Sequence, residues 1–392
     1  MGRRMDQAIA VRMPGEELEQ AGVIALFGIA GALQFSIAAA QLLLTIALIC
    51  WVALLVVRRE RLDAPAFFWP LTAYAAATLL SAIFSADPRT SFIDCKQLVL
   101  FLLVPLTYRL AHGRHGGTLI TVVVSCAAAS AAFGIFQYGI LHYDQLNQRP
   151  QGTLGHYMTY SGLLMIVIAV ALARILFASY GRLWTALVMP ALAVAVTLTL
   201  SRNAWVGACA AAAVLFSLKD FRLFAIAPIV LAIGVALAPA LVTKRFASLF
   251  DMNDATTRDR VAMLHVGERM IQNHPLTGVG PNMVERLYPS YRGPDAVKPV
   301  NPHLHNVPLQ IAAERGLPAL AIWIWFIVAL LRDLWKRFVV GGQMQFLAAA
   351  ALATVTALLT AGMFEYNFGD SEVLMLFLIV VTLPAAAQRH SD

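Results

Sequence analysis

The sequence predicts an all-α integral membrane protein of about twelve transmembrane helices, on the evidence of its composition and of its long apolar segments. Apolar residues make up 59% of the 392 residues and charged residues only 13%, whereas a soluble domain is nearer half apolar and a quarter charged. A helix needs roughly 20 apolar residues to cross the hydrocarbon layer, and such stretches follow one another almost from end to end. They lack the alternation of a barrel strand, so helices are expected, because backbone groups in hydrocarbon must pair within their own segment.

The apolar segments give the order of the predicted helices. They lie at about 21–36, 38–57, 67–85, 97–112, 117–140, 157–178, 183–200, 203–218, 222–241, 305–331, 344–363 and 371–387. Residues 1–20 and 388–392 are expected to be cytoplasmic tails, because the N-terminal stretch is polar and lacks the cleavage site of a signal peptide. Residues 21–241 then hold the first nine transmembrane helices and residues 305–387 the last three. Residues 242–304 are predicted to form one long periplasmic loop.

Basic residues set the predicted orientation. One set of short connections and both ends carry Arg3, Arg4, Arg12, Arg58, Arg59, Arg61, Arg109, Arg114, Arg174, Arg182, Lys219, Arg222, Arg332, Lys336, Arg337 and Arg389. The opposite short loops carry only Arg89, Lys96, Arg149 and Arg202. Since Lys and Arg accumulate on the cytoplasmic side, both termini are predicted to be cytoplasmic. The net charge of +7 is therefore assigned to helix ends and not to nucleic-acid binding.

The long loop is predicted to contain a helix at residues 258–273. Its apolar positions form an imperfect stripe suited to lying along the membrane surface. They are Val261, Leu264, Val266, Met270 and Ile271. The following PLTGVGPN, residues 275–282, ends that helix with proline and glycine.

Two loop motifs place arginines on the external side. SRNAWVG at 201–207 carries Arg202, and TRDRVAM at 257–263 carries Arg258 and Arg260. An arginine that reaches lipid headgroups beside Trp205 is the alternative interpretation of the first motif. A solvated helix face is the alternative for the second.

The histidine motif NPHLHNVPLQIAAERG at 301–316 is the third external feature. His303 and His305 alternate just before a helix and Asn306 follows them. No cysteine or carboxylate stands at ligand spacing from the two histidines, so no metal site is predicted. Glu314 and Arg315 lie inside the membrane-entering helix, where charge is costly unless it is paired or faces a cavity. They are expected to be functional, with mutual pairing as the alternative.

Two more external segments are candidates for the same site. RPQGTLGHYMTYSG at 149–162 brings Arg149, His156 and Tyr160 to the outer end of the sixth helix. Its alternative is a glycine-rich turn with an aromatic interfacial belt. FEYNFGDSE at 364–372 carries acidic residues at the mouth of the last helix pair, which either orient sugar hydroxyls or an arginine or are solvated. They are Glu365, Asp370 and Glu372.

Three of these strings resemble, in order and position, the signature of the O-antigen ligase family, which includes O-antigen polymerases and bacterial protein O-oligosaccharyltransferases. They are SRNAWVG, the run from Arg260 to PLTGVGPN, and HLHNVPLQIAAERG. The motifs cover roughly residues 190–330, and the helix layout is similar over the whole chain. The family's ExGLxG pattern reads here as ERGLPAL. The resemblance implies a GT-C-like glycosyltransferase architecture in the bacterial inner membrane, with its active site on the periplasmic face.

The resemblance also implies an activity and its residues. Members transfer a polysaccharide en bloc from undecaprenyl pyrophosphate to an acceptor, here expected to be lipid A-core oligosaccharide, with inversion and without metal or cofactor. His305 matches the catalytic position, where a histidine suits a general base near neutral pH. Arg202 and Arg260 match the pyrophosphate-binding positions, with Arg258 beside them, and guanidinium groups suit phosphate oxygens. The expected substrate contacts are His303, Asn306, Arg149, His156, Tyr160 and Glu314.

Two other functions stay open. An O-antigen polymerase would use the same residue types, with a second lipid-linked glycan as acceptor. A polysaccharide flippase would also have about twelve spans, but transporters bind substrate near the bilayer midplane and often show inverted repeats. The charges here gather at the external boundary and no repeat is visible, which favours an enzyme.

Overall fold

The computed structural model describes residues 15–248, 255–294, 296–342 and 344–389. Within these ranges the chain is helical, with 77% of residues in helices and no strand. The all-α prediction is therefore confirmed. Most of the predicted tail 1–20, together with residues 390–392, lies outside the described residues, and α1 already begins at Glu16.

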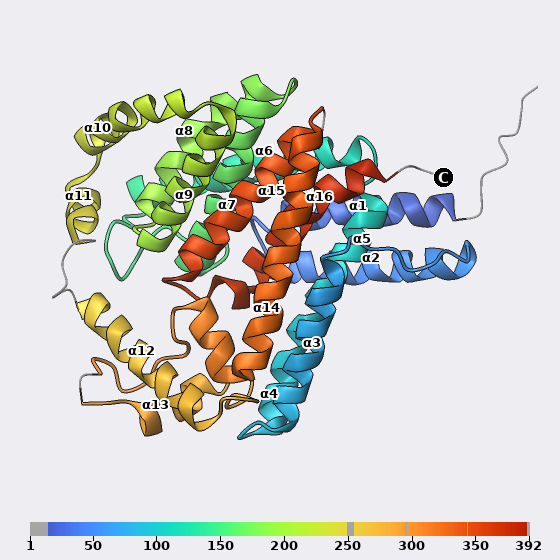
Figure 1. The fold of residues 1–392 in the computed structure, drawn as a ribbon. Coiled ribbons are helices and arrows are strands. Elements are labelled where there is room, and N and C mark those ends of the chain that lie inside the picture. The colour runs from blue at the N-terminus through green and yellow to red at the C-terminus, as the bar shows by residue number, and fades with distance from the viewer. Residues whose placement is uncertain (1–14, 249–254, 295, 343, 390–392) are drawn as a thin grey trace, which may run out of the picture.

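The helices are given below in chain order, and Figure 1 labels the α-helices among them. They are α1 (Glu16–Ala32), α2 (Ile37–Val57), α3 (Phe68–Ile83), α4 (Pro88–Asp94), η1 (Cys95–Leu102), α5 (Leu103–Leu110), α6 (His115–Gly139), α7 (Tyr157–Phe177), α8 (Arg182–Leu198), α9 (Arg202–Lys219), η2 (Phe221–Ile226), α10 (Ala227–Leu237), α11 (Ala240–Ala247), α12 (Ala255–Asn273), α13 (Val284–Tyr291), α14 (Val307–Val340), α15 (Met344–Gly362), η4 (Asn367–Gly369) and α16 (Ser371–Gln388). Each of the twelve predicted apolar segments overlaps one or more of these helices.

Seven helices of the described part are long and apolar enough to cross a membrane. They are Ile37–Val57, Pro88–Leu110, His115–Gly139, Tyr157–Phe177, Val307–Val340, Gln345–Gly362 and Ser371–Gln388. The helices Phe68–Ile83 and Arg182–Leu198 and the run Phe221–Gly234 are apolar but shorter. The chain is thus a multi-pass membrane protein, and the count of about twelve spans stays a prediction.

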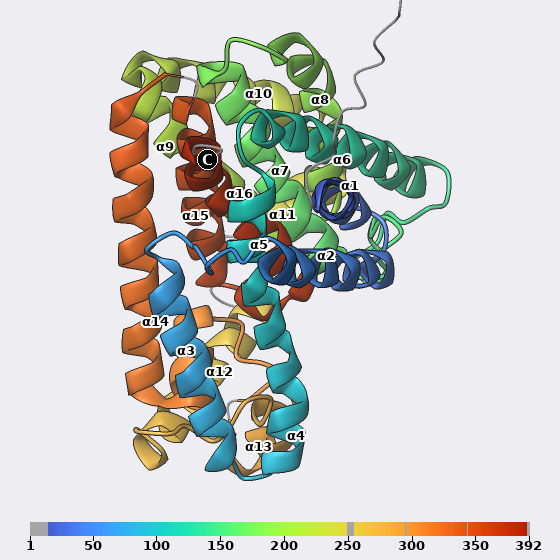
Figure 2. The same cartoon turned by 90° about the vertical axis from the view of Figure 1, so that its right-hand side faces the viewer.

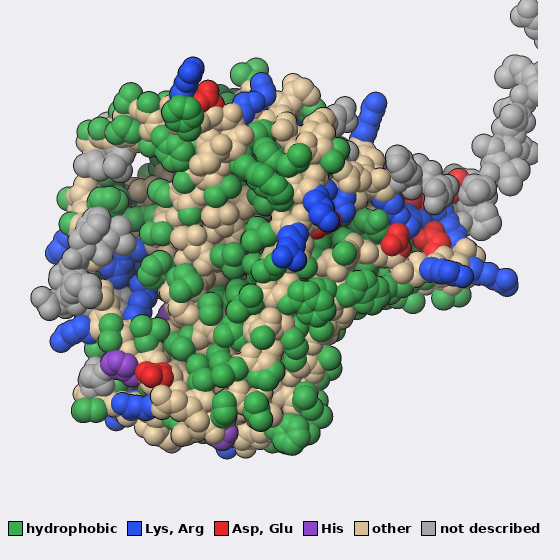
Figure 3. All heavy atoms as spheres, in the orientation of Figure 1, with side chains coloured by type: hydrophobic (Ala, Val, Ile, Leu, Met, Phe, Trp, Pro, Cys, Tyr) green, Lys and Arg blue, Asp and Glu red, His purple; other side chains and the backbone are tan. Residues whose placement is uncertain are grey.

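The bundle centres on α15 and α16, whose apolar stretches are 78% buried. Small residues let α15 pack closely against α7, α9, α14 and α16, as is usual between membrane helices. By contrast, α1 and α2 form an antiparallel pair that projects from the bundle in Figures 1 and 2, and α2 leaves Leu42, Ile49 and Val56 exposed. Hydrophobic side chains also cover the surface over α3 and α14 in Figure 3.

The predicted loop helix exists as α12, but its apolar stripe is used differently from the prediction. Val266 and Met270 are fully buried in a small core that also includes Met283 of the following loop. Val261 and Leu264 stay exposed. The stripe therefore packs the loop onto α13 and the start of α14, instead of lying along the membrane surface over its whole length.

A break at Gly316 separates the first turns of α14 from its long apolar part. Gly316 has φ 82 and ψ 167, and a Cβ there would lie 2.2 Å from the Leu276 carbonyl oxygen, so only glycine fits. The break frees the carbonyls of Ala313 and Glu314, which accept hydrogen bonds from the backbone of Val279 and of Gly280, both at 2.9 Å. The loop after α12 is thereby fixed against the helix turn that follows the two histidines.

Candidate functional site

The histidine loop is shaped by the start of α14. Asn306 caps the helix, accepting a hydrogen bond from the Leu309 backbone at 2.9 Å, and the Gln310 side chain accepts one from the Leu304 backbone at 2.7 Å. The Asn306 amide also donates to the Met363 carbonyl at 3.1 Å. His305 itself is held at φ 49, a left-handed conformation that costs a non-glycine residue energy and is found at functional sites. The loop is thus clamped to the turn between α15 and α16.

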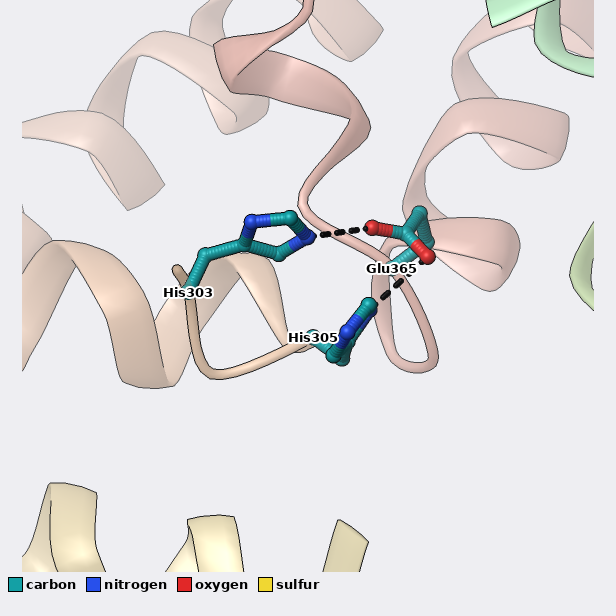
Figure 4. A group of neighbouring side chains, drawn as sticks. All are labelled: His303, His305 and Glu365. Carbon is teal, nitrogen blue, oxygen red and sulfur yellow. Dashed lines mark hydrogen bonds and ion pairs between the residues drawn. The ribbon is translucent and has the colours of Figure 1, made fainter. Parts of the chain in front are cut away.

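Glu365, in that turn, binds both histidines. Its Oε1 lies 2.9 Å from His303 Nε2 and its Oε2 lies 2.8 Å from His305 Nδ1. Figure 4 shows the two rings directed from one loop toward a single carboxylate on the other, with ring centroids 4.3 Å apart. The carboxylate is almost fully buried, whereas the histidines are partly exposed.

The charge state of Glu365 sets the tautomers of both rings. Burial alone would raise the pKa of Glu365, but hydrogen bonds from His303 and His305 hold it well below its usual range. An ionised carboxylate only accepts hydrogen bonds, so both contacting ring nitrogens carry a proton. His305 Nε2 and His303 Nδ1 are then the nitrogens left to take a proton whenever the rings are neutral.

The same three side chains are also a candidate metal-ligand set. One atom from each of His303, His305 and Glu365 lies within 4.8 Å of the others. No carboxylate stands at ligand spacing in the sequence, because Glu365 follows His305 by sixty residues and reaches the histidines only through the fold. The prediction of no metal site is untested. Two histidines and a glutamate are a known zinc ligand set, so a metal at this position has to be tested directly.

A pocket of about 180 Å³ opens beside His303 and Glu365. Its lining brings together several segments that are far apart in the sequence, and four of them were singled out above: the start of α7, the start of α9, the histidine loop and the segment 364–372. The lining residues are His156, Met158, Gly162, Met165, Asn203, Ala204, His303, Ala361, Glu365, Tyr366, Asn367, Gly369, Asp370 and Val373. His305 is outside this lining, on the other oxygen of Glu365.

A second hydrogen-bonded chain includes two residues of the pocket lining, His156 and Asp370. His156 Nδ1 is 3.3 Å from Thr159 Oγ1, and that hydroxyl donates to Asp370 Oδ2 at 2.5 Å. Asp370 Oδ1 accepts from the Val373 backbone at 3.1 Å and so caps α16. Asp370 is therefore held by both oxygens, while the nearby Glu372 does not line the pocket.

None of the four predicted arginines lines the pocket. Arg260 donates to the Phe364 carbonyl at 3.0 Å, next to Glu365. Arg202 is buried and donates to the Ser248 carbonyl at 2.9 Å. Arg149 stacks on Tyr157 at 4.3 Å, and burial, together with the charge of Arg202, lowers its pKa. Arg258 is exposed.

Three of the residues predicted to contact substrate make hydrogen bonds within the protein and do not line the pocket. Tyr160 is fully buried and donates to the Ser130 carbonyl at 2.9 Å. Glu314 is buried and accepts a hydrogen bond from Arg315 at 2.8 Å, and Arg315 also lies 3.7 Å from Asp94, which favours the mutual-pairing interpretation. Asn306 is the helix cap described above. Sequence reasoning missed Asn203 and Thr159, although Asn203 directly follows Arg202.

A comparison with protein families gives one match for this region. Residues 187–324 match the family model described as O-antigen ligase. The match contains Arg202, Arg260 and both histidines, and Glu365 and Asp370 follow it in the chain. No curated protein matches the sequence.

Proposed function

We propose, on the premise that this chain carries the domain of the O-antigen ligase family at residues 187–324, that it is a membrane glycosyltransferase. It transfers a polysaccharide en bloc from undecaprenyl pyrophosphate to a hydroxyl of lipid A-core oligosaccharide. The reaction takes place at the periplasmic face of the bacterial inner membrane, in a GT-C-like architecture. The observation that carries this proposal is the single buried carboxylate of Glu365 bound to His303 and His305.

The chemistry requires a base for the acceptor hydroxyl. In the proposed step the hydroxyl oxygen attacks the anomeric carbon while His305 Nε2 takes its proton. The bond from the anomeric carbon to the pyrophosphate oxygen breaks, and direct displacement inverts the configuration. Glu365, bonded to His305 Nδ1 at 2.8 Å, holds the proton of the neutral ring on Nδ1, which directs Nε2 to act as the acceptor, and it stabilises the imidazolium that forms, as the carboxylate of a catalytic triad does.

The leaving group requires positive charge, which Arg202 and Arg260 supply in this proposal. Undecaprenyl pyrophosphate departs with its charge on phosphate oxygens, and a planar guanidinium binds two such oxygens at once. Burial and the positive charge of Arg202 both lower the pKa of Arg149. A phosphate bound between the two arginines would therefore relieve their repulsion. Arg258 is exposed two residues before Arg260 and is assigned to the approach of the anion.

A specific observation favours His303 as the second candidate base. His303 lines the pocket whereas His305 does not, and its Nδ1 is also left free by the bond to Glu365. A different acceptor gives the second candidate function, which is that of an O-antigen polymerase, since this enzyme needs the same base and the same arginines. A lipid-linked glycan would then replace lipid A-core as acceptor.

The decisive experiment uses purified full-length protein with lipid-linked glycan as donor and lipid A-core as acceptor. His305→Ala is expected to reduce transfer by about 10²–10⁴-fold, the usual contribution of positioned proton transfer, and His303→Ala by less. The reverse order would make His303 the base. Loss of native activity on addition of a chelator would replace the base by a metal site. Product formed only with a second lipid-linked glycan would make the protein a polymerase.

The orientation has its own test. A cysteine introduced at 284–300 is expected to react with a membrane-impermeant thiol reagent in cells whose outer membrane alone is permeable. A cysteine in the Arg332–Arg337 segment is the control and should stay unlabelled until the inner membrane is broken. The opposite pattern would place the pocket in the cytoplasm and rule out the proposed substrates.

A further inference from the structure

Asn203 is a buried polar residue of the pocket whose side chain the fold does not use. It lies in the first turn of α9 and only 7% of its surface is exposed. No hydrogen bond joins its side-chain amide to any residue within the described ranges. Its amide atoms are not among the fully buried polar atoms that lack a partner, and the residue lines the pocket, so both its donor and its acceptor are open to a ligand there. A ligand that enters the pocket would supply the missing partner.

The other groups in the pocket wall are polar but already fixed. Asp370 is held by Thr159 and by the Val373 backbone, and each of its oxygens keeps a lone pair for another donor. Since the Thr159 hydroxyl donates to Asp370, His156 Nδ1 must be the donor to Thr159, which leaves His156 Nε2 as an acceptor. Met158, Met165 and Val373 supply apolar surface between these groups.

From these lining residues we infer that the pocket is a subsite for one sugar ring. Asn203, Asp370 and His156 would recognise this ring by hydrogen bonds to its hydroxyl groups. An amide that both donates and accepts, in the same pocket as a carboxylate that only accepts, matches hydroxyls, which do both. The apolar side chains match the C–H faces of the ring. The volume of about 180 Å³ suits a single ring, because pockets for larger ligands run from about 300 to 1,000 Å³.

The position of the pocket identifies which sugar it holds, and this step rests on the proposed function. Asn203 directly follows Arg202, and Glu365 directly follows Phe364, whose carbonyl binds Arg260. The pocket is therefore flanked by both arginines assigned to the pyrophosphate. The ring beside the pyrophosphate is the first sugar of the donor glycan, so Asn203 and Asp370 select that sugar.

Binding measurements separate the sugar subsite from the phosphate site. The protein is the full chain in nanodiscs with His305→Ala, so that the donor is not consumed. The probes are undecaprenyl pyrophosphate alone and the same carrier bearing one glucose, galactose or N-acetylglucosamine. At least one sugar-bearing carrier is expected to bind roughly tenfold more tightly than the bare carrier, the equivalent of one or two net hydrogen bonds.

Asn203→Ala is expected to abolish that tenfold difference and to leave the affinity for the bare carrier unchanged. Since Asn203 has no partner in the described ranges, the variant should fold, and its melting temperature checks this. The exposed Asn273→Ala is the matched control and should change neither affinity. Equal binding of bare and sugar-bearing carriers by the parent protein would overturn the subsite, as would an Asn203→Ala effect on the bare carrier or on lipid A-core binding alone. Failure of every carrier to bind would instead contradict the proposed function.

Discussion

Two clusters of charged and titratable side chains, at separate places in the fold, use similar residues for opposite purposes. In one cluster, Arg109 binds Glu60 through two hydrogen bonds of 2.7 and 2.8 Å and Glu19 through a third of 2.9 Å. Arg58 holds the second oxygen of Glu19 at 2.5 Å. Two arginines and two glutamates thus balance one another and join α1, α5 and the loop after α2.

In the other cluster, Glu365 also uses both oxygens, but its partners are histidines. Each ring keeps one nitrogen that Glu365 does not bind, and His303 faces a pocket. Arginine stays charged at all physiological pH values, whereas histidine exchanges a proton near neutrality. The comparison indicates that a network whose charges are all satisfied stabilises the fold, while one that retains a proton acceptor beside a cavity is suited to chemistry.

Glu365→Gln is expected to have the largest effect, a fall in transfer of about 10²–10⁴-fold. Glutamine keeps the shape, but its NH₂ group cannot accept a hydrogen bond, so one histidine must change tautomer. Measuring kcat with the purified variant checks this, and Glu372→Gln, also in the acidic segment but outside the pocket lining, is the control. If Glu365→Gln retained native turnover, Glu365 would be a structural link like Glu60.

Arg260→Lys tests whether Arg260 binds the pyrophosphate of the donor. Lysine keeps the positive charge but loses the planar fork that binds two phosphate oxygens, so transfer is expected to fall roughly tenfold to a hundredfold. The exposed Arg258→Lys should have a much smaller effect. Unchanged activity of the Arg260→Lys protein, at matched expression, would reduce Arg260 to a residue that only tethers the 364–370 turn.

Arg109→Ala tests the balanced network, and the expected loss is in stability. Removing one member of a buried pair leaves carboxylates without their partner, which costs about 3 kcal/mol. We take the lower part of the usual range because the Glu19 and Glu60 side chains keep 21% of their surface exposed. Thermal unfolding of the detergent-solubilised protein measures the loss, and turnover per folded molecule should not change. A turnover defect without destabilisation would mean that the two clusters are coupled.

Acid is expected to give the smallest and most gradual effect. The hydrogen bond from Arg109, opposed by burial, holds the pKa of Glu60 below its usual value of 4.5. A carboxyl group whose pKa is lowered by folding stabilises the protein above the unfolded pKa and loses that contribution as the pH falls toward the folded pKa. The melting temperature should therefore drop below about pH 4.5, and less steeply in Glu60→Gln. Identical slopes for the two proteins would show that Glu60 does not contribute.

The positions of the helices were predictable from the sequence because backbone groups in hydrocarbon must form hydrogen bonds within their own segment. Segments of about 20 apolar residues must be helical in a membrane, and helices indeed lie in all twelve predicted segments. The motif residues could also be identified from the sequence, and they fall inside the matched region. They are Arg202, Arg260, His303 and His305. The burial of Val266 and Met270 in a protein core could not be predicted from the sequence, since an apolar stripe does not specify whether lipid or protein covers it.

Only the tertiary structure decided which side chains share the site. Glu365 was visible as an acidic loop residue, yet its bonds to His303 and His305 depend on how α14 and α15 pack. Tyr160 and Glu314 looked like site residues and lie in the protein interior, while Asn203 looked like a spacer and lines the pocket. The physical reason is that hydrophobicity and helix periodicity act along the chain, whereas hydrogen bonds between loops far apart in sequence depend on distances that only packing sets.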